Sequence, residues 1–533
     1  MHYRMLSTAP TLWARRACLV FALASASLHA AAGSPTSAAT KPCRIDGVPN
    51  ELQCGVIQRP LDPTKPQGVQ IDVHYLVVPA LARNKQRDPV LLLAGGPGQS
   101  AIAVAPAVLP RLTRLNYRRD LVFIDQRGTG QSAPLQCGDE SQLPVAQALD
   151  PRAQLQRLEQ CRLALAQLPH GDLRLYTTTI AMQDFEAVRQ QLGAPQWNLI
   201  GASYGTRAAL EYLRQFPDKV RRTVLDGVAP PDMVLPASFS ADGQAALDAA
   251  LLACEQDSAC AKQYPQLRQQ WAALLQGLPR AVSVLHPVTG LPEHFTLTRD
   301  LLLRSVRAPL YVPALTSALP AAIDAASQGR WEGLLGLGSG VAGGGGKRKA
   351  TRLAMGMHFA VVCAEDVPRL DKAVDTPGVD FGNSDTAFYT QACQNWPQGA
   401  VPSDFYTLPA APSPVLVLSG GADPATPPRH GERVAQALGA TDARRVQHIV
   451  VPQAGHGVAA VGCMNDVLFR FIDAVQDRDA LPQDAGCALK IPRPTVFVPI
   501  QTREVSPLGR PEGKRAPSGG SDPRSGGAWG LKS

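Results

Sequence analysis

Short apolar runs that alternate with helical patterns constrain the fold of this chain most. The runs are PVLLLAGG (89–96), DLVFIDQRG (120–128), WNLIGAS (197–203) and RTVLDGV (222–228), and their apolar residues stop at Gly, Asp or Ser. Uninterrupted apolar runs of this length are typical of parallel strands buried on both faces. The stretch 180–193 repeats apolar residues on one helical side and stops at Gly193. The alternation predicts an α/β fold with a mainly parallel sheet and helices on both faces.

The alternation stops after Val228 and resumes near residue 414, which indicates an insertion. Residues 231–405 are mostly helical in pattern, with a glycine-rich loop at 336–350, and the runs 414–423 and 446–457 resume the strand pattern. The alternating stretch 69–80 predicts an antiparallel strand. We therefore expect a flexible leader at 33–42, a core formed by 33–230 and 406–490, a mainly helical cap at 231–405, and a disordered tail at 491–533.

The first 32 residues have the pattern of an export signal. Arg15 and Arg16 precede the apolar run ACLVFALASASL, and the small residues HAAAGS follow it. Cleavage is expected near Ala32, and Cys18 lies inside the apolar run rather than just after it, which argues against a lipid anchor. The run is too short for a permanent membrane span, so no stable membrane insertion is expected. The pattern predicts an exported protein, periplasmic or extracellular.

The net charge of +8 is concentrated at the two ends of the chain. Residues 1–32 carry three arginines and no acid, and residues 503–533 carry six basic and three acidic residues, which leaves +2 on the remainder. A nucleic-acid-binding protein carries its basic patch on the folded part. Nucleic acid is therefore not an expected partner.

The cysteines also indicate export. Of eleven, Cys18 would leave with the signal, and the other ten come as sequence neighbours. Five local disulfides are the simplest arrangement in an oxidising compartment, although the sequence leaves their connectivity open. A metal site is the alternative, but no Cys-x-x-Cys pair or histidine cluster supports it. The neighbours are Cys43 and Cys54, Cys137 and Cys161, Cys254 and Cys260, Cys363 and Cys393, and Cys463 and Cys487.

Ser203 in LIGASYGTRAAL (199–210) follows an apolar strand and precedes a helix. Gly201, Ala202 and Gly205 leave room for the sharp turn that exposes a nucleophilic serine. The N-terminus of the following helix favours negative charge at this point. The alternative is an ordinary hydroxyl among small residues.

A nucleophilic serine needs a histidine base and an orienting carboxylate. Asp423 closes the strand pattern 414–423, and His456 follows the strand pattern HIVVP. Both come after Ser203 with the acid first, the chain order of α/β-hydrolases. A turn-initiating Asp423 before Pro424 is the alternative, and Asp442 is a second candidate acid. His358, His430 and His448 are poorer candidate bases by position.

An oxyanion hole needs two backbone N–H groups aimed at the developing charge. Tyr204 follows the serine and would supply one, while AGGPGQS (94–100) would supply the other from Gly95 or Gly96. Pro97 stiffens this loop. An ordinary Gly-Pro turn is the alternative, and the spacing matches neither phosphate-loop pattern.

These motifs together resemble the prolyl-aminopeptidase and tripeptidyl-aminopeptidase family of serine peptidases, a branch of the α/β-hydrolases. The resemblance covers about residues 43–490 and rests on GGPG (95–98), DQRGTGQS (125–132), GASYGT (201–206), GGADPATPP (420–428) and AGHG (454–457). Cys463 and Cys487 resemble the C-terminal segment of the tripeptidyl branch. The resemblance implies an α/β-hydrolase fold, an acyl-enzyme on Ser203, no cofactor, and release of N-terminal residues or tripeptides from short peptides.

Two further residues are candidates for binding the substrate. The resemblance implies that cap acids hold the substrate ammonium, and Glu365 with Asp366 beside it match, unless they are a solvated acid pair before a turn. Arg127 in the DQRG motif is expected to organise its loop. Ala94 replaces the histidine that many prolyl aminopeptidases carry before GGPG, which favours the tripeptidyl branch.

Two rival functions use the same residues differently. An exported carboxylesterase or lipase would use the same triad, and a catalytically inactive binding protein would keep only the fold. The intact Ser, Asp and His argue against the second rival. Substrate length, cleavage preference and oligomeric state are left open by the sequence.

Overall fold

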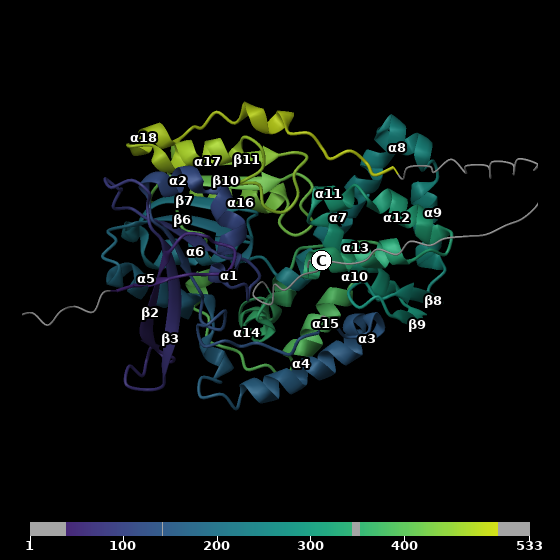
Figure 1. Ribbon diagram of the computed structural model, residues 1–533, viewed down its shortest axis with the longest axis horizontal. Helices are drawn as coiled ribbons and strands as arrows, with labels where there is room; N and C mark the ends of the chain where they lie inside the picture. The colour runs from purple at the N-terminus through teal and green to yellow at the C-terminus, as the bar shows by residue number, and fades with distance from the viewer. Residues whose placement is uncertain (1–38, 141, 344–351, 499–533) are drawn as a thin grey trace, which may run out of the picture. The chain divides into compact units, whose positions relative to one another are not determined.

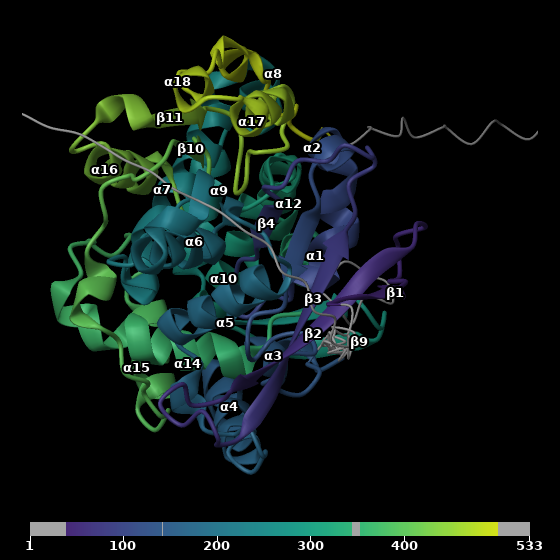
Figure 2. The same ribbon diagram turned by 90° about the vertical axis from the view of Figure 1, so that its left-hand side faces the viewer.

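A nine-stranded sheet carries the fold, in the order β1-β2-β3-β5-β4-β6-β7-β10-β11. The computed structural model describes residues 39–140, 142–343 and 352–498. Strands β1 to β3 pair antiparallel at one edge of the sheet, and β3 pairs antiparallel with β5 (Figure 2). From β5 to β11 all pairings are parallel. The strands are β1 (Lys41–Cys43), β2 (Leu52–Pro60), β3 (Gln70–Val78), β4 (Val90–Leu93), β5 (Leu121–Ile124), β6 (Trp197–Ala202), β7 (Val220–Asp226), β10 (Val415–Gly420) and β11 (Val446–Val451).

The central strands are buried on both faces, as their apolar runs predict. Every residue of β4, β5 and β10 is buried. Successive side chains point to opposite faces, so Leu91 belongs to one apolar cluster and Leu92 to another. The mostly parallel α/β-hydrolase sheet expected from the sequence is confirmed.

Helices cover both faces of this sheet (Figure 1). On one face, α5 (Thr178–Gln191), α6 (Tyr204–Gln215) and α16 (Pro428–Leu438) contribute to the first apolar cluster. On the other, α1 (Ala101–Val108), α2 (Thr113–Arg118) and α17 (Met464–Asp473) contribute to the second. The short helix α18 (Asp477–Ala480) follows α17. Because the strands from β5 to β11 run parallel, their carboxyl ends lie at one edge of the sheet, where the loops that follow them can meet.

The inserted segment has an apolar core of its own, which includes Leu247, Trp271, Leu302 and Ile323. It is mainly helical, with one antiparallel hairpin of β8 (Arg280–Leu285) and β9 (Pro292–Leu297). Its helices are α7 (Leu235–Gln256), α8 (Ser258–Gln263), α9 (Leu267–Gln276), α10 (Arg299–Leu310), α11 (Pro313–Thr316), α12 (Leu319–Ser327), α13 (Glu332–Gly343), α14 (Met355–Glu365) and α15 (Ser384–Cys393).

The packing crosses the boundaries that the sequence predicts. Helix α14 lies in the expected cap, yet its Met357 and Val361 belong to the apolar cluster under the sheet. Conversely, α3 (Val145–Leu149) and α4 (Pro151–Leu165) come from the first core segment but contact the cap, since the Arg304 side chain donates to Gln154 at 2.7 Å. Figure 1 shows α4 beside α15. Cap and core are therefore interleaved rather than divided at residues 231 and 405.

The ends of the described chain also differ from expectation. Lys41 and Pro42, placed in a flexible leader, form part of β1. Residues 491–498, placed in a disordered tail, run to the cap instead, where Phe497 N–H donates to the Ser317 carbonyl at 3.0 Å (Figure 1). The expected signal segment 1–32 and the tail residues 499–533 lie outside the described residues.

Five disulfides join the ten cysteines predicted to pair, each with its sequence neighbour, so the prediction of local bridges is confirmed. The bridges are Cys43–Cys54, Cys137–Cys161, Cys254–Cys260, Cys363–Cys393 and Cys463–Cys487.

Within the described residues, we find no helix that is both long enough and apolar enough to cross a membrane.

Candidate active site

Ser203 lies on the sharp turn between β6 and α6. Its φ of 56° and ψ of −125° are unfavourable for a residue with a Cβ, and such strain clusters at functional sites. The turn needs small neighbours, because a Cβ on Gly205 would lie 2.1 Å from the Leu93 carbonyl oxygen. The Ser203 N–H donates to the Asp226 carbonyl at 2.9 Å, which joins the turn to the end of β7. These features define a nucleophile elbow.

The GGPG loop lies directly against this elbow. A Cβ placed on Gly95 would be 3.2 Å from the Ser203 Cβ, so any side chain there would push the loop or the serine away by a few tenths of an ångström. Gly96 has a φ of +113°, a conformation that favours glycine. The backbone of the loop can thus face the same space as the serine side chain.

The three residues after β5 form hydrogen bonds that hold the segments around this elbow in place. The Asp125 carboxylate accepts the Ser100 hydroxyl at 2.6 Å, just beyond the GGPG loop. The Gln126 amide donates to the Tyr204 hydroxyl at 3.0 Å. Arg127 clamps Asp184 of α5 through Nε and Nη2 at 2.7 and 2.9 Å. Arg127 thus anchors the loop to α5, and that it does not contact the substrate stays a prediction.

Asp423 and His456 form a hydrogen-bonded pair beyond β10 and β11. Oδ2 of Asp423 lies 2.8 Å from Nδ1 of His456. The other oxygen, Oδ1, accepts the N–H groups of Ala425 and Thr426 at 2.8 and 3.0 Å. The Thr426 hydroxyl donates to Oδ2 at 2.7 Å and lies 3.1 Å from the same imidazole nitrogen. The carboxylate is therefore held in one orientation toward the histidine.

The environment of this pair shifts both pKa values. Burial alone would raise the pKa of Asp423, but the charge and hydrogen bond of His456 outweigh it and hold the pKa low. Burial alone would lower the pKa of His456, but Asp423 and then Asp226 outweigh it and raise the pKa. The pair therefore favours an imidazole that takes up a proton readily.

Asp226 connects the elbow to the histidine segment. Its buried carboxylate accepts the N–H groups of Val458 and Ala459 at 2.8 and 2.9 Å, just after His456. Its carbonyl accepts the Ser203 N–H. No motif marks Asp226 as more than a strand-terminal acid, and the same is true of Thr426 in the GGADPATPP stretch. Neither role is predictable from the sequence.

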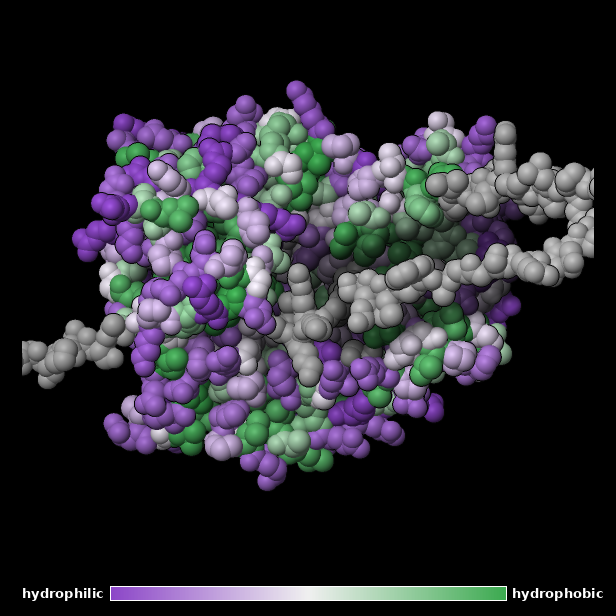
Figure 3. Space-filling model, in the orientation of Figure 1, coloured by the Kyte–Doolittle hydropathy of each residue, from purple (hydrophilic) through white to green (hydrophobic). Residues whose placement is uncertain are grey.

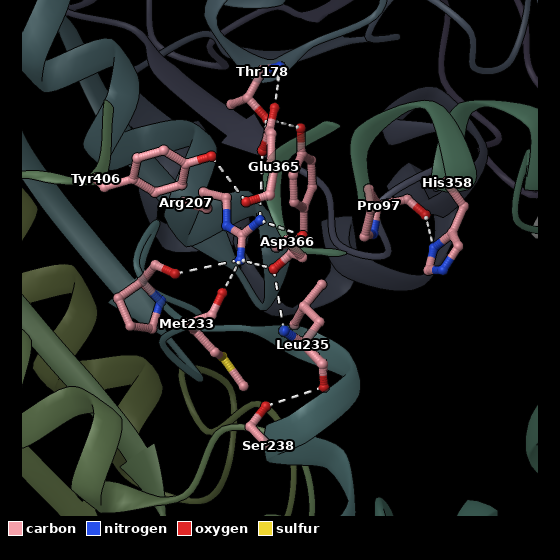
Figure 4. Close-up of polar contacts among 12 residues, drawn as sticks. Pro97, Thr178, Arg207, Met233, Leu235, Ser238, His358, Glu365, Asp366 and Tyr406 are labelled. Carbon is pink, nitrogen blue, oxygen red and sulfur yellow. Dashed lines mark hydrogen bonds and ion pairs between the residues drawn. The ribbon is translucent and has the colours of Figure 1, made fainter. Parts of the chain in front are cut away.

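Glu365 and Asp366 are fully buried at the end of α14, in a cluster with Arg207 of the elbow helix (Figure 4). Arg207 binds Asp366 through two nitrogens at 2.9 and 3.0 Å. Glu365 accepts the Thr178 N–H at 2.7 Å and its hydroxyl at 3.0 Å. Burial raises the pKa of Glu365 to about 7, against the opposing charge of Arg207.

This cluster reaches the residue after the serine. The Thr178 hydroxyl lies 2.6 Å from the Tyr204 hydroxyl, and thus links Glu365 to Tyr204. The predicted ammonium ligands are therefore internal, each with protein partners. Their role toward substrate stays a prediction.

The cap contacts the site on the side of the histidine and on the side of the GGPG loop. The Tyr311 ring packs edge-on to the His456 ring with centroids 5.2 Å apart, and its carbonyl accepts the His456 N–H at 3.1 Å. On the other side, Nδ1 of His358 lies 3.2 Å from the Pro97 carbonyl in the GGPG loop (Figure 4). A carbonyl only accepts, so Nδ1 donates, and the buried ring, with its lowered pKa, accepts the Tyr389 hydroxyl at Nε2, 2.9 Å away. The visible face is hollowed between core and cap (Figure 3).

The sheet, the elbow and the acid–histidine pair define an α/β-hydrolase. The family model described as alpha/beta hydrolase fold matches residues 88–462, and the chain belongs to this family. It is therefore a hydrolase of the α/β fold, as the motifs predict.

The chain is also similar in sequence to individual proteins, among them two peptidases and a carboxylesterase. A tripeptidyl aminopeptidase of Streptomyces coelicolor is 31% identical over 209 residues, 36% of this chain and 37% of the relative. The serine protease Hip1 of Mycobacterium tuberculosis is 28% identical over 207 residues, 36% and 39% of the two chains. The match thus spans about two fifths of these relatives. Carboxylesterase B of Mycobacterium tuberculosis is 29% identical over 427 residues, 73% and 78% of the two chains.

Proposed function

We propose that this chain is an exported serine exopeptidase that releases N-terminal residues or tripeptides from short peptides. The observation that carries the proposal is the hydrogen bond of 2.8 Å between Asp423 Oδ2 and His456 Nδ1. Asp226 connects the segment just after His456 to the strained turn at Ser203. The aminopeptidase and protease names of two relatives support the choice of substrate.

In the proposed mechanism, His456 takes the proton of Ser203 as its oxygen attacks the scissile carbonyl. Asp423 stabilises the imidazolium that forms. The backbone N–H groups of Tyr204 and of Gly95 or Gly96 stabilise the oxyanion. The tetrahedral intermediate collapses, His456 gives its proton to the leaving amine, and water then releases the acyl group by the same steps.

Peptide length is the part of the proposal that depends on the cap. The cap segment approaches the site through Tyr311 and His358, which suits short peptides better than folded proteins. Ala94 in place of the histidine of many prolyl aminopeptidases favours the tripeptidyl branch.

Three substrates test the reaction class: a tripeptidyl coumarylamide with a free amine, its N-acetylated form, and a short-chain acyl ester. We expect the free amine to be preferred by about ten- to a hundredfold in kcat/KM, because losing one charge-assisted contact costs about 1.5–3 kcal/mol. Hydrolysis of the ester, with both coumarylamides left uncleaved, would instead identify a carboxylesterase. That second candidate is favoured by the longer match to carboxylesterase B.

The ammonium prediction needs a variant that keeps the buried cluster in shape. Glu365→Gln preserves the volume beside Thr178 and removes the charge, whereas Glu365→Ala would leave a cavity. If Glu365 or Asp366 holds the ammonium, Glu365→Gln lowers kcat/KM on the free amine and spares the acyl ester. An equal loss on both substrates would contradict that role.

Export is supported by the five disulfides, since such bridges persist in oxidising compartments. Expression of the full sequence in a bacterial host, followed by fractionation and N-terminal sequencing, tests it. We expect a mature chain that begins near Gly33 outside the cytoplasm.

A further inference from the structure

Arg307 lies on the cap helix α10, one turn before Tyr311. Tyr311 packs on the His456 ring and accepts the His456 N–H. The guanidinium is thus one helical turn from the cap residue that touches the proposed base. The aromatic rings of Phe239 and Tyr389, 6.4 Å apart, continue from Arg307 toward His358 and the GGPG loop.

Two contacts fix the orientation of this side chain. Nη1 of Arg307 donates to Oδ2 of Asp385 at 2.9 Å, and Cζ lies 4.1 Å above the Phe239 ring centroid. Burial disfavours the charge, but Tyr311 and Asp385 outweigh it and raise the pKa of Arg307 further. The group is therefore a fixed cation.

The remaining edge of the guanidinium is unusual. Nε and Nη2 are both buried, and neither donates a well-aligned hydrogen bond to a described residue, although the Tyr311 hydroxyl lies near enough to interact with the guanidinium. Among the residues that the structure describes, no other side chain has two such nitrogens. Buried donors without partners are uncommon in folded proteins, and two on one guanidinium call for an explanation such as a catalytic role or a bound water or ion.

Other arginines of this protein show what the same edge binds. In several of them, Nε and Nη2 together clamp the two oxygens of one carboxylate, the side-on geometry that guanidinium favours. Examples are Arg127 with Asp184, Arg189 with Glu186, and Arg214 with Glu211.

We propose that the Nε–Nη2 edge of Arg307 binds a carboxylate of the substrate beside the reaction centre. The carboxylate comes from the C-terminus of a short peptide or from an acidic side chain. The inference rests on the proposed peptidase function and adds a substrate class to it, namely anionic peptides. Since protein atoms cover the edge in this structure, a covering side chain moves aside on binding, and binding is therefore measured directly.

The test uses the Ser203→Ala chain, which would hold peptides uncleaved. Calorimetry compares the tetrapeptide Ala-Ala-Ala-Ala as free acid, its C-terminal amide, and two amides with one Ala replaced by Glu or Gln. We expect the acid, or the Glu amide, to bind about tenfold or more tightly than its neutral counterpart. The first result identifies the C-terminus as the source, and the second identifies a side chain.

Arg307→Gln, added to Ser203→Ala, should abolish that preference and leave the affinity for the neutral amide within about twofold. Arg304→Gln is the matched control, because Arg304 lies on the same helix, stacks on Phe388 at 5.0 Å and donates to Gln154. It should keep the preference. Equal binding of acid and amide by the parent, or an undiminished preference in Arg307→Gln, would overturn the inference.

Two further measurements separate this inference from the proposed function. Arg307→Gln in the chain with Ser203 intact should still react with a fluorophosphonate and melt cooperatively, which shows that it folds. If the unaltered chain cleaves no peptide but Ser203→Ala still prefers the carboxylate, the peptidase proposal fails and the carboxylate site stands. Peptide cleavage without any carboxylate preference would instead overturn the carboxylate site and leave the peptidase proposal intact.

Discussion

The backbone N–H of Ser203 donates to the carbonyl of Asp226 at 2.9 Å, and Ala202, the residue before the serine, pairs with Asp226 across β6 and β7. The carboxylate of the same Asp226 accepts the Val458 and Ala459 N–H groups. One strand-terminal residue thus holds the elbow with its backbone and the His456 segment with its side chain.

Replacing the proposed nucleophile should remove activity and leave the fold. Ser203→Ala deletes only a hydroxyl, and for residues that act as a unit the expected loss in kcat is on the order of a million-fold. Fluorophosphonate labelling should disappear, and the melting temperature should stay near that of the parent. Turnover close to the parent value would rule out the serine mechanism.

The pH dependence of kcat/KM should follow the titration of His456. The base must be neutral, and its raised pKa keeps it protonated to a higher pH, so kcat/KM should rise with pH through a midpoint above 6.5. Asp423→Asn removes the main charge that raises this pKa. It should move the midpoint down and lower kcat by about 10⁴.

Asp442→Asn is the control for that experiment, because Asp442 is the other candidate acid and pairs with Arg444 at the surface. It should leave both midpoint and kcat unchanged. A larger effect from Asp442 than from Asp423 would contradict the assignment of the acid.

Thr426 should tune the acid through its hydroxyl. Thr426→Val keeps the shape but removes the 2.7 Å donor to the buried Asp423 carboxylate, which costs about 1.5–3 kcal/mol. The pKa of Asp423 should rise, and kcat should fall by about tenfold or more. Thr426→Ser keeps a hydroxyl and should restore most of the activity. Equal loss in both variants would point to packing rather than to the hydrogen bond.

Asp226→Asn should act on the histidine segment. An amide NH₂ cannot accept, so one of the N–H groups of Val458 and Ala459 loses its buried partner, at about 1–3 kcal/mol. We expect slower fluorophosphonate labelling of Ser203 together with a lower melting temperature. Unchanged labelling at an unchanged melting temperature would show that Asp226 does not position this segment.

The disulfides should stabilise unequally. Cys363–Cys393 spans 30 residues and Cys254–Cys260 spans 6, while all four cysteines are buried. The chain-entropy relation makes the longer bridge worth about 1.3 kcal/mol more. Denaturant unfolding of the two double-serine variants checks this, and full reduction should destabilise more than either. An unchanged melting temperature in strong reductant would contradict a stabilising role.

Much of the sheet was predictable because its strands are local signals. The runs at β4, β5 and β10 are apolar throughout, and burial on both faces demands that pattern. Helix α14 shows the limit. Its sequence lies in the insertion, yet Met357 and Val361 pack under the sheet, and an apolar helix pattern does not say which core it will join.

The candidate site divides in the same way. The motif around Ser203 and the chain order of Asp423 and His456 were visible, because an elbow needs small residues and the strand ends were marked. The donors around Asp423 and the partners of Glu365 could not be predicted, because the residue type of a threonine or a glutamate does not reveal whether its side chain faces solvent or a buried arginine.

By itself, the sequence determined the strand-and-helix alternation, the order of the proposed catalytic residues and the cysteine neighbours, all of which depend on residue type and short spacing. The tertiary structure alone decided that Asp226 joins the elbow to the histidine segment, that Glu365 and Asp366 are buried around Arg207, and that Arg307 keeps a donor edge without a well-aligned acceptor. These relationships join residues far apart in the chain, and only packing brings such groups within hydrogen-bonding distance.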